Sequence, residues 1–190
     1  MRIISILLML LCLGGCSSKH KSLKVYTLNA NSVVSMQHGK YRTKILRVTY
    51  SRSIKEKVNN KMRFSYSASE QGVYQDSQWS NNIGRLLQGV LIDNLERSAM
   101  FRAVLPYTSS LKEDYRLESN ILDFSHWARG DSSYAIVSIQ FTLININTGD
   151  LVKSKRFRYK EPTDTRDAKG YADATNRIMS RLCRDLLKWL

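Results

Sequence analysis

The sequence has very few of the residues that cross-link a chain or interrupt its helices and strands. It contains three cysteines and two prolines among 190 residues. Cys12 and Cys16 lie in the first sixteen residues, so Cys183 is the single cysteine of the remaining chain and no disulfide can form within it. The fold must therefore be stabilised by packing. Because Cys183 falls at the edge of an apolar helical stripe, a small buried hydrophobe is favoured over a reactive thiol.

Recognisable catalytic and metal-binding motifs are also missing. The histidines are His20, His38 and His126, and no HExxH, Cys/His ligand set, Ser-His-Asp order or Walker loop is present. Asp123 and His126 lie three apart in an extended segment, so they are expected on opposite faces rather than as a dyad. The sequence thus predicts a protein that is not an enzyme and that binds no cofactor or metal.

Acidic residues are scarce relative to basic ones. The chain has 30 Lys and Arg against 16 Asp and Glu, a net charge of +14. Such an excess indicates an anionic partner, which could be a membrane surface, an acidic protein face or a nucleic acid. Two stretches are strongly basic, although a solvated face is the simpler explanation of any charge run. The candidate contact residues are Lys40, Arg42, Lys44, Arg47, Arg52, Lys153, Lys155, Arg156 and Arg158.

The first fifteen residues have the layout of a secretory signal. A charged start at Arg2 precedes the apolar run 3–13, which is too short to anchor in a bilayer, and no later stretch approaches ~18 apolar residues. Export argues against a nucleic-acid partner. Leu13-Gly14-Gly15-Cys16 resembles the lipobox of bacterial lipoproteins, whereas the alternative is a plain signal with a chance cysteine.

That resemblance implies cleavage before Cys16 and attachment of diacylglycerol to its sulfur, with palmitate among the acyl chains. Two or three chains would hold the protein firmly on a membrane, since each buried methylene contributes about 0.8 kcal/mol. We therefore expect a signal peptide at 1–15, a lipidated tether at 16–22 and a single domain at 23–190. Ser17 after the cysteine favours the periplasmic face of the outer membrane over the inner membrane, again by resemblance.

Strand patterns alternate with two helical patterns in the predicted domain. Residues 25–28, 45–50 and 62–66 read as strands, and a helical period runs from Trp79 to Leu95, with Ser77 or Ser80 as its cap. A strand at 102–105 follows and stops at Pro106. These elements predict a strand–helix–strand crossover. If 62–66 and 101–105 lie parallel, the connection is right-handed and the helix covers one face of the sheet.

The second half predicts an antiparallel meander followed by a helix. Segments 115–127, 133–146 and 151–160 are extended and separated by short turns, with a bulge near Ile121 and a central middle strand. An amphipathic helix follows Pro162, with Asp164 or Thr165 as its cap. We expect its apolar stripe to pack in the core, and the alternative is that the stripe lines a ligand site. The order ββαββββα predicts an α+β two-layer sandwich: a mainly antiparallel mixed sheet with both helices packed on one face.

The succession of these segments resembles the ABC-type transport auxiliary lipoprotein family. The resemblance is carried, in order, by Cys16, Tyr26-Thr27-Leu28, Ile45-Leu46-Arg47-Val48, Tyr66, Trp79, Ser98-Ala99-Met100-Phe101, Tyr115-Arg116-Leu117-Glu118, Ile121-Leu122-Asp123-Phe124, Ser133-Tyr134-Ala135-Ile136-Val137, Thr148-Gly149, Ser154-Lys155-Arg156-Phe157 and Lys188-Trp189-Leu190. The chain differs from many members in having Thr49 to Arg52 where they have a proline.

The resemblance implies a non-catalytic periplasmic accessory of an MCE-type ABC transporter of lipids. Its partners would be an MCE-domain protein with its permease and ATPase, phospholipid is the candidate cargo, and a homo-oligomer is left open. The alternative is an envelope-assembly or structural lipoprotein that binds lipopolysaccharide or another anionic partner through the basic stretches.

Overall fold

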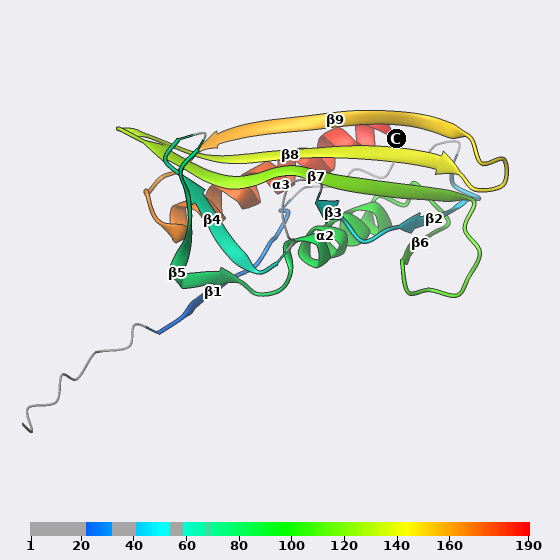
Figure 1. Ribbon diagram of the computed structural model, residues 1–190. Helices are drawn as coiled ribbons and strands as arrows, with labels where there is room; N and C mark the ends of the chain where they lie inside the picture. Colours follow the sequence, from blue (N-terminus) through cyan, green and yellow to red (C-terminus); the bar gives the residue numbers. More distant parts are fainter. Residues whose placement is uncertain (1–21, 32–40, 54–58, 68) are drawn as a thin grey trace, which may run out of the picture.

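A computed structural model describes residues 22–31, 41–53, 59–67 and 69–190 (Figure 1). Its described part contains nine strands in one sheet and two helices. In chain order these are β1 (Lys24–Tyr26), β2 (Ile45–Val48), β3 (Arg52–Ser53), β4 (Lys61–Ser65), β5 (Gln71–Trp79), α2 (Ile83–Arg97), β6 (Ala103–Pro106), β7 (Tyr115–Arg129), β8 (Ser132–Asn145), β9 (Leu151–Pro162) and α3 (Ala168–Trp189).

Strand β7 organises the sheet. Along one edge it pairs antiparallel with β8, and β8 pairs antiparallel with β9, which confirms the predicted meander. Along its other edge β7 pairs in parallel with β2, β3 and β4 in succession. Strand β6 lies outside β2, while β5 and then β1 lie outside β4. The sheet is therefore mixed, with its longest ladders antiparallel.

The middle strand of the meander carries the centre of the core. Its inward row of Ala135, Val137, Ile139, Phe141 and Leu143 is fully buried. The β7–β8 register shifts between Ile121 and Asp123, which confirms the predicted bulge. This extra residue restores the alternation, so that both ends of the 15-residue strand present apolar side chains to the same side.

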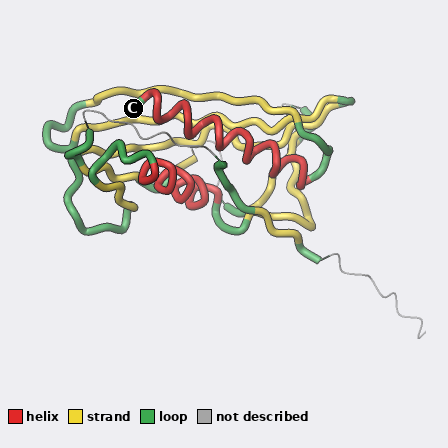
Figure 2. Tube along the Cα trace, turned by 180° about the vertical axis from the view of Figure 1, so that it is seen from behind, coloured by secondary structure: helices red, strands yellow, loops and turns green. Residues whose placement is uncertain are grey.

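Both helices lie on one face of the sheet, in front of it in Figure 2. Helix α3 packs along β8 and β9, and α2 packs on β2 and β6. The apolar stripe of α3, including Tyr171, Ile178, Met179 and Leu182, is buried in the core. The two-layer α+β sandwich with both helices on one face is thus confirmed. Because both helices lie on this face, no helix of the described residues covers the opposite face of the meander.

Cys183 is buried, as its position in the stripe predicted. It is 1% exposed, and burial raises the pKa of its thiol to about 12. A thiol with so high a pKa has almost no thiolate at neutral pH, so it behaves as a small hydrophobe.

The predicted start of the first helix was wrong. Trp79 ends strand β5, and α2 begins at Ile83 with Asn82 as its cap, since the Asn82 side chain accepts from the Gly84 N–H at 2.9 Å. The strand before it was missed. Strands β4 and β6 do run parallel in the sheet, because both are parallel to the β2–β7 pair, but β7 and β2 lie between them.

The cap of α3 also differs from the prediction. Asp167, rather than Asp164 or Thr165, caps the helix by accepting from the Gly170 N–H at 2.9 Å, and the Thr165 hydroxyl donates to the same carboxylate at 2.6 Å. Neither helix of the described ranges is long and apolar enough to cross a membrane.

Candidate functional site

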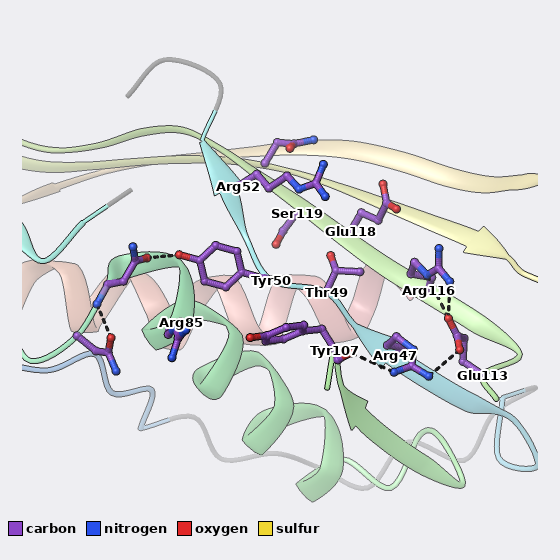
Figure 3. A pocket seen from close by; sticks show the side chains of 13 residues that line it. Arg47, Thr49, Tyr50, Arg52, Arg85, Tyr107, Glu113, Arg116, Glu118 and Ser119 are labelled. Atoms are coloured by element: carbon purple, nitrogen blue, oxygen red, sulfur yellow. Dashed lines mark hydrogen bonds and ion pairs between the residues drawn. The ribbon is translucent and has the colours of Figure 1, made fainter. Parts of the chain in front are cut away.

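A polar pocket of about 1170 Å³ opens where the chain passes from β2 to β3 beside the start of α2 (Figure 3). Strand β7 forms its floor, and the segment after β6 forms a further wall. The lining residues are Arg47, Thr49, Tyr50, Arg52, Asn81, Asn82, Arg85, Tyr107, Glu113, Arg116, Glu118, Ser119 and Asn120. Four arginines and two glutamates give these side chains a net positive charge.

Arg47 is committed to holding one wall of this pocket together. Its guanidinium donates to the carbonyl oxygens of Pro106, Tyr107 and Ser109, the last at 2.7 Å, and to that of Leu111. It also pairs with Glu113 at 2.9 Å, where the two side chains are only 12% and 8% exposed. The guanidinium thereby fastens the 106–113 segment to β2.

Glu113 is shared by two arginines. Arg116 donates to its Oε1 from Nη2 at 2.6 Å and from Nε at 3.1 Å. The hydrogen bond from Arg47, followed by that from Arg116, outweighs the effect of burial and lowers the pKa of Glu113 to about 2. This carboxylate therefore stays ionised, and it offsets one of the two guanidinium charges.

The other end of the pocket is organised by Tyr50. Its hydroxyl donates to Asn82 Oδ1 at 2.5 Å, and burial raises the pKa of the phenol. Arg85 of α2 lies close enough to stabilise the phenolate form electrostatically. Arg85 and Arg52 are exposed, and among the described residues neither guanidinium has a hydrogen bond or ion pair. Two cationic groups of this pocket are thus open to a ligand.

The first predicted basic group is dispersed by the fold. Arg47 and Arg52 line the pocket, whereas Lys44 lies at its far side and pairs with Asp114 at 3.6 Å. Arg42 is exposed in the turn before β2. Lys40 and Cys16 lie outside the described residues. The predicted group is therefore only partly brought together.

The second basic group forms a continuous row along the edge strand β9. Lys155, Arg156 and Arg158 are exposed, and Lys153 donates to the carbonyls of Trp189 and Leu190 at 2.6 and 3.1 Å. Side chains of the row alternate between the helical face, where Lys155 lies 4.9 Å from the Phe157 ring, and the uncovered face, where Arg156 donates to Ser138. Among the described residues no carboxylate side chain pairs with Lys155, Arg156 or Arg158, so these three charges are exposed at the edge of the sheet.

Asp123 and His126 form no dyad. Asp123 accepts from Ser125 at 2.7 Å, while His126 is fully buried between Tyr74 at 2.7 Å and Ser133 at 2.7 Å. The His126 ring stacks on Tyr171. Burial lowers the pKa of His126 to about 4. The histidine is therefore neutral at physiological pH and is part of the core.

Sequence reasoning missed most of the pocket. Tyr50, Arg85, Tyr107 and Glu113 come from distant segments, and no spacing in the chain indicates that they converge. Within the described ranges no three His, Cys, Asp or Glu side chains gather in a way that could hold a metal ion. The chemistry available in the pocket is therefore charge and hydrogen bonding by guanidinium groups.

The model of the ABC-type transport auxiliary lipoprotein component matches residues 26–186. This chain belongs to that family, so it is a lipoprotein-family member associated with an ABC transporter system, as its sequence indicated.

Solved structures share the fold at low sequence identity. Protein XCC0632 from Xanthomonas campestris, described as a DUF330 member, is 17% identical, with a TM-score of 0.75 over 88% of this chain and 94% of its own. An uncharacterised protein is 13% identical, with a TM-score of 0.67 over 88% and 97%. The hypothetical protein CT253 from Chlamydia trachomatis is 10% identical, with a TM-score of 0.51 over 77% and 94%. No curated protein matches the sequence.

Proposed function

We propose that this protein is a non-catalytic, lipid-anchored subunit of an MCE-type ABC system that moves phospholipid between membranes. The family match over residues 26–186 carries the proposal. The work of the subunit is docking or lipid handling, and the ATPase and permease are other chains. A domain built on a continuous packed core, with its histidine buried, is consistent with a role that requires no chemistry.

Anchoring is proposed through the N-terminal segment. Residues 1–15 are removed, Cys16 receives the lipid, and 16–22 tether the domain of 23–190 to the periplasmic face of the outer membrane. The first described strand, β1, begins at Lys24 on an edge of the sheet, so a tether can leave the domain without crossing its core.

Docking is proposed along β9. The exposed cations Lys155, Arg156 and Arg158 have no carboxylate partner among the described residues, whereas Lys153 is bound to the end of α3. An acidic face of the partner would supply the missing charge. The strand is also an edge of the sheet, so its outer backbone groups are available to a partner.

The test is recovery of the transporter from its own envelope. The tagged, lipidated protein is purified in mild detergent, and bound proteins and lipids are identified by mass spectrometry. An MCE-domain protein with its permease and ATPase is expected. The charge reversal Lys155→Glu, Arg156→Glu, Arg158→Glu should lose these partners, whereas the matched exposed variant Arg102→Glu, Arg129→Glu, Arg166→Glu should keep them.

A second candidate function rests on the same row of cations. An envelope-assembly or structural lipoprotein would use it to bind lipopolysaccharide, whose phosphates are dense and anionic. In that case lipopolysaccharide or outer-membrane assembly proteins would be recovered, the same charge reversal would abolish their binding, and deletion of the transporter would have no effect. Recovery of that set alone would refute the transport proposal.

A further inference from the structure

We propose that the pocket beside Tyr50 is a binding site for an anionic phospholipid headgroup, with Arg52 and Arg85 as the cationic residues that flank it. The inference depends on the chemistry of the pocket and needs no transporter partner. It goes beyond the proposed function, which leaves open whether lipid ever touches this subunit.

The charge of the pocket selects an anion. Four arginines and two glutamates line it, a net charge of +2. Glu113 is ion-paired with both Arg47 and Arg116, whose Nη2 atoms lie 2.9 and 2.6 Å from its carboxylate oxygens. That pairing leaves the guanidinium groups of Arg52 and Arg85 without a partner among the described residues. Guanidinium groups match the geometry of phosphate oxygens and form strong charge-assisted hydrogen bonds with them.

The cations come from rigid elements. Arg52 is held by β3, which pairs with Asn120 and Ile121 of β7, and Arg85 stands in the first turn of α2. The amide of Gly84 is already bound by Asn82, so the helix end itself offers little to an anion. Figure 3 shows the two side chains on opposite sides of Tyr50, with Arg52 toward Ser119 and Arg85 on α2. The binding groups are therefore the arginine side chains.

The shape and rim of the pocket favour a lipid over an extended acidic peptide. A hollow of about 1170 Å³ exceeds what a phosphate ion fills, so room remains for the glycerol and the first part of the acyl chains. The segment after β6 adds exposed apolar groups at this side, with Tyr107 and Leu111 47% and 59% exposed. These side chains suit the apolar part of an amphiphile.

One lining residue is negatively charged, so its substitution should change the affinity for an anion in the opposite direction to an arginine substitution. Glu118 projects from β7 at the pocket and has no hydrogen bond or ion pair among the described residues. Its charge should repel a phosphate. Removing this charge should therefore tighten phosphate binding, whereas removing a cation should weaken it, which a purely structural role for these residues would not produce.

The experiment measures binding to the full-length lipidated protein in a sugar-headed detergent, which carries no phosphate. Isothermal titration uses dihexanoylphosphatidylglycerol, inorganic phosphate, glycerol 3-phosphate and a penta-glutamate peptide as separate probes. We expect the lipid to bind at least about tenfold more tightly than either water-soluble phosphate. Arg52→Gln with Arg85→Gln should weaken lipid binding about tenfold or more, in line with the loss of one or two charge-assisted hydrogen bonds.

Two further variants make the result specific. Glu118→Gln should tighten lipid binding about two- to fivefold, and Arg102→Gln with Arg129→Gln, which removes the same charge elsewhere, should change it less than twofold. Thermal unfolding by circular dichroism verifies that each variant is folded. Equal affinity for lipid and inorganic phosphate would overturn the lipid source.

Binding of only the peptide, or lipid binding that is indifferent to both arginines, would overturn the site. These outcomes are independent of whether a transporter is recovered, so failure of this proposal and failure of the proposed function are distinguishable.

Discussion

The two basic stretches of the sequence look alike in composition but have opposite fates in the fold. In the first, Arg47 and Lys44 are paired with Glu113 and Asp114, two acids that β7 brings in from the other half of the chain. In the second, Lys155, Arg156 and Arg158 of β9 are exposed and pair with no carboxylate in the described part of the chain. Charge density along a sequence thus does not distinguish a cation that holds the fold from one that is offered to a partner. The distinction lies in where the acids are.

The largest change in the free energy of unfolding is expected from a substitution of Arg47. Arg47→Gln leaves Glu113, which is 8% exposed, with one partner fewer and leaves several carbonyl oxygens of the 106–111 segment without their donor. We expect a loss of about 3 kcal/mol in the free energy of unfolding, measured by urea denaturation. Arg158→Gln on β9 is the control. A loss below about 0.5 kcal/mol at Arg47 would remove the contrast between the two groups.

Lowering the pH should remove the stabilisation that Glu113 gives to the first basic group, and it should leave the cations of β9 unaffected. The folded pKa of Glu113 is about 2, below its ordinary value of 4.5. A lowered folded pKa contributes stability that is full above pH 4.5 and is lost as the pH falls from 4.5 toward 2. The loss amounts to roughly 3 kcal/mol.

The measurement is urea unfolding across that pH window, with Glu113→Gln as the comparison. This variant should be less stable near neutral pH and should show a flatter decline between pH 4.5 and 2. Parallel pH profiles for the two proteins would contradict the role given to this carboxylate.

A smaller effect is expected at Asp114. Its Oδ2 accepts from the Ile45 N–H at 2.8 Å and its Oδ1 lies 3.6 Å from the Lys44 ammonium. Because the backbone hydrogen bond lowers the pKa of Asp114 more than the lysine does, most of the effect lies in that bond. Asp114→Asn should cost about 1 kcal/mol by thermal unfolding. Asp150→Asn, in an exposed turn, serves as the reference and should cost less.

The smallest change in stability is expected on β9. Lys155→Gln with Arg156→Gln and Arg158→Gln should alter the free energy of unfolding by less than about 1 kcal/mol, since exposed charges contribute little. The same triple variant should nevertheless recover far less of the anionic partner from the envelope. A strong destabilisation without loss of the partner would reverse the assignment of the two groups.

The second half of the fold was predictable because its signals are local. The inward row of β8 alternates without a break from Ala135 to Leu143, and the turns on either side carry Gly130 and Gly149 with positive φ of 52° and 79°. The helical period of α3 is equally continuous. In these segments the residues that face one another are close in the chain, so periodicity alone sets the register.

The first half was harder for a physical reason. Strand β5 is mostly polar, and its buried positions include Ser77 as well as Trp79. It therefore lacks the row of alternating apolar residues by which a strand is recognised in a sequence. The pocket was invisible for a related reason. Arg47 and Glu113 meet only because β2 pairs with β7, a parallel contact between segments far apart in sequence, and no local pattern encodes that pairing.

The two-sided pairing of β7 fixes an order of events during synthesis. Strands β2, β3 and β4 each join the sheet through residues of 115–127, and the paired residues are 62 to 69 positions apart, from Phe64↔His126 to Leu46↔Tyr115. Until that strand has been made, the described N-terminal elements can form only α2, the β4–β5 hairpin and the short β1–β5 and β2–β6 pairs. Such late, non-local pairing slows folding and leaves apolar segments exposed for longer. We therefore expect the N-terminal strands to be assembled into one sheet only after the central strand has been synthesised.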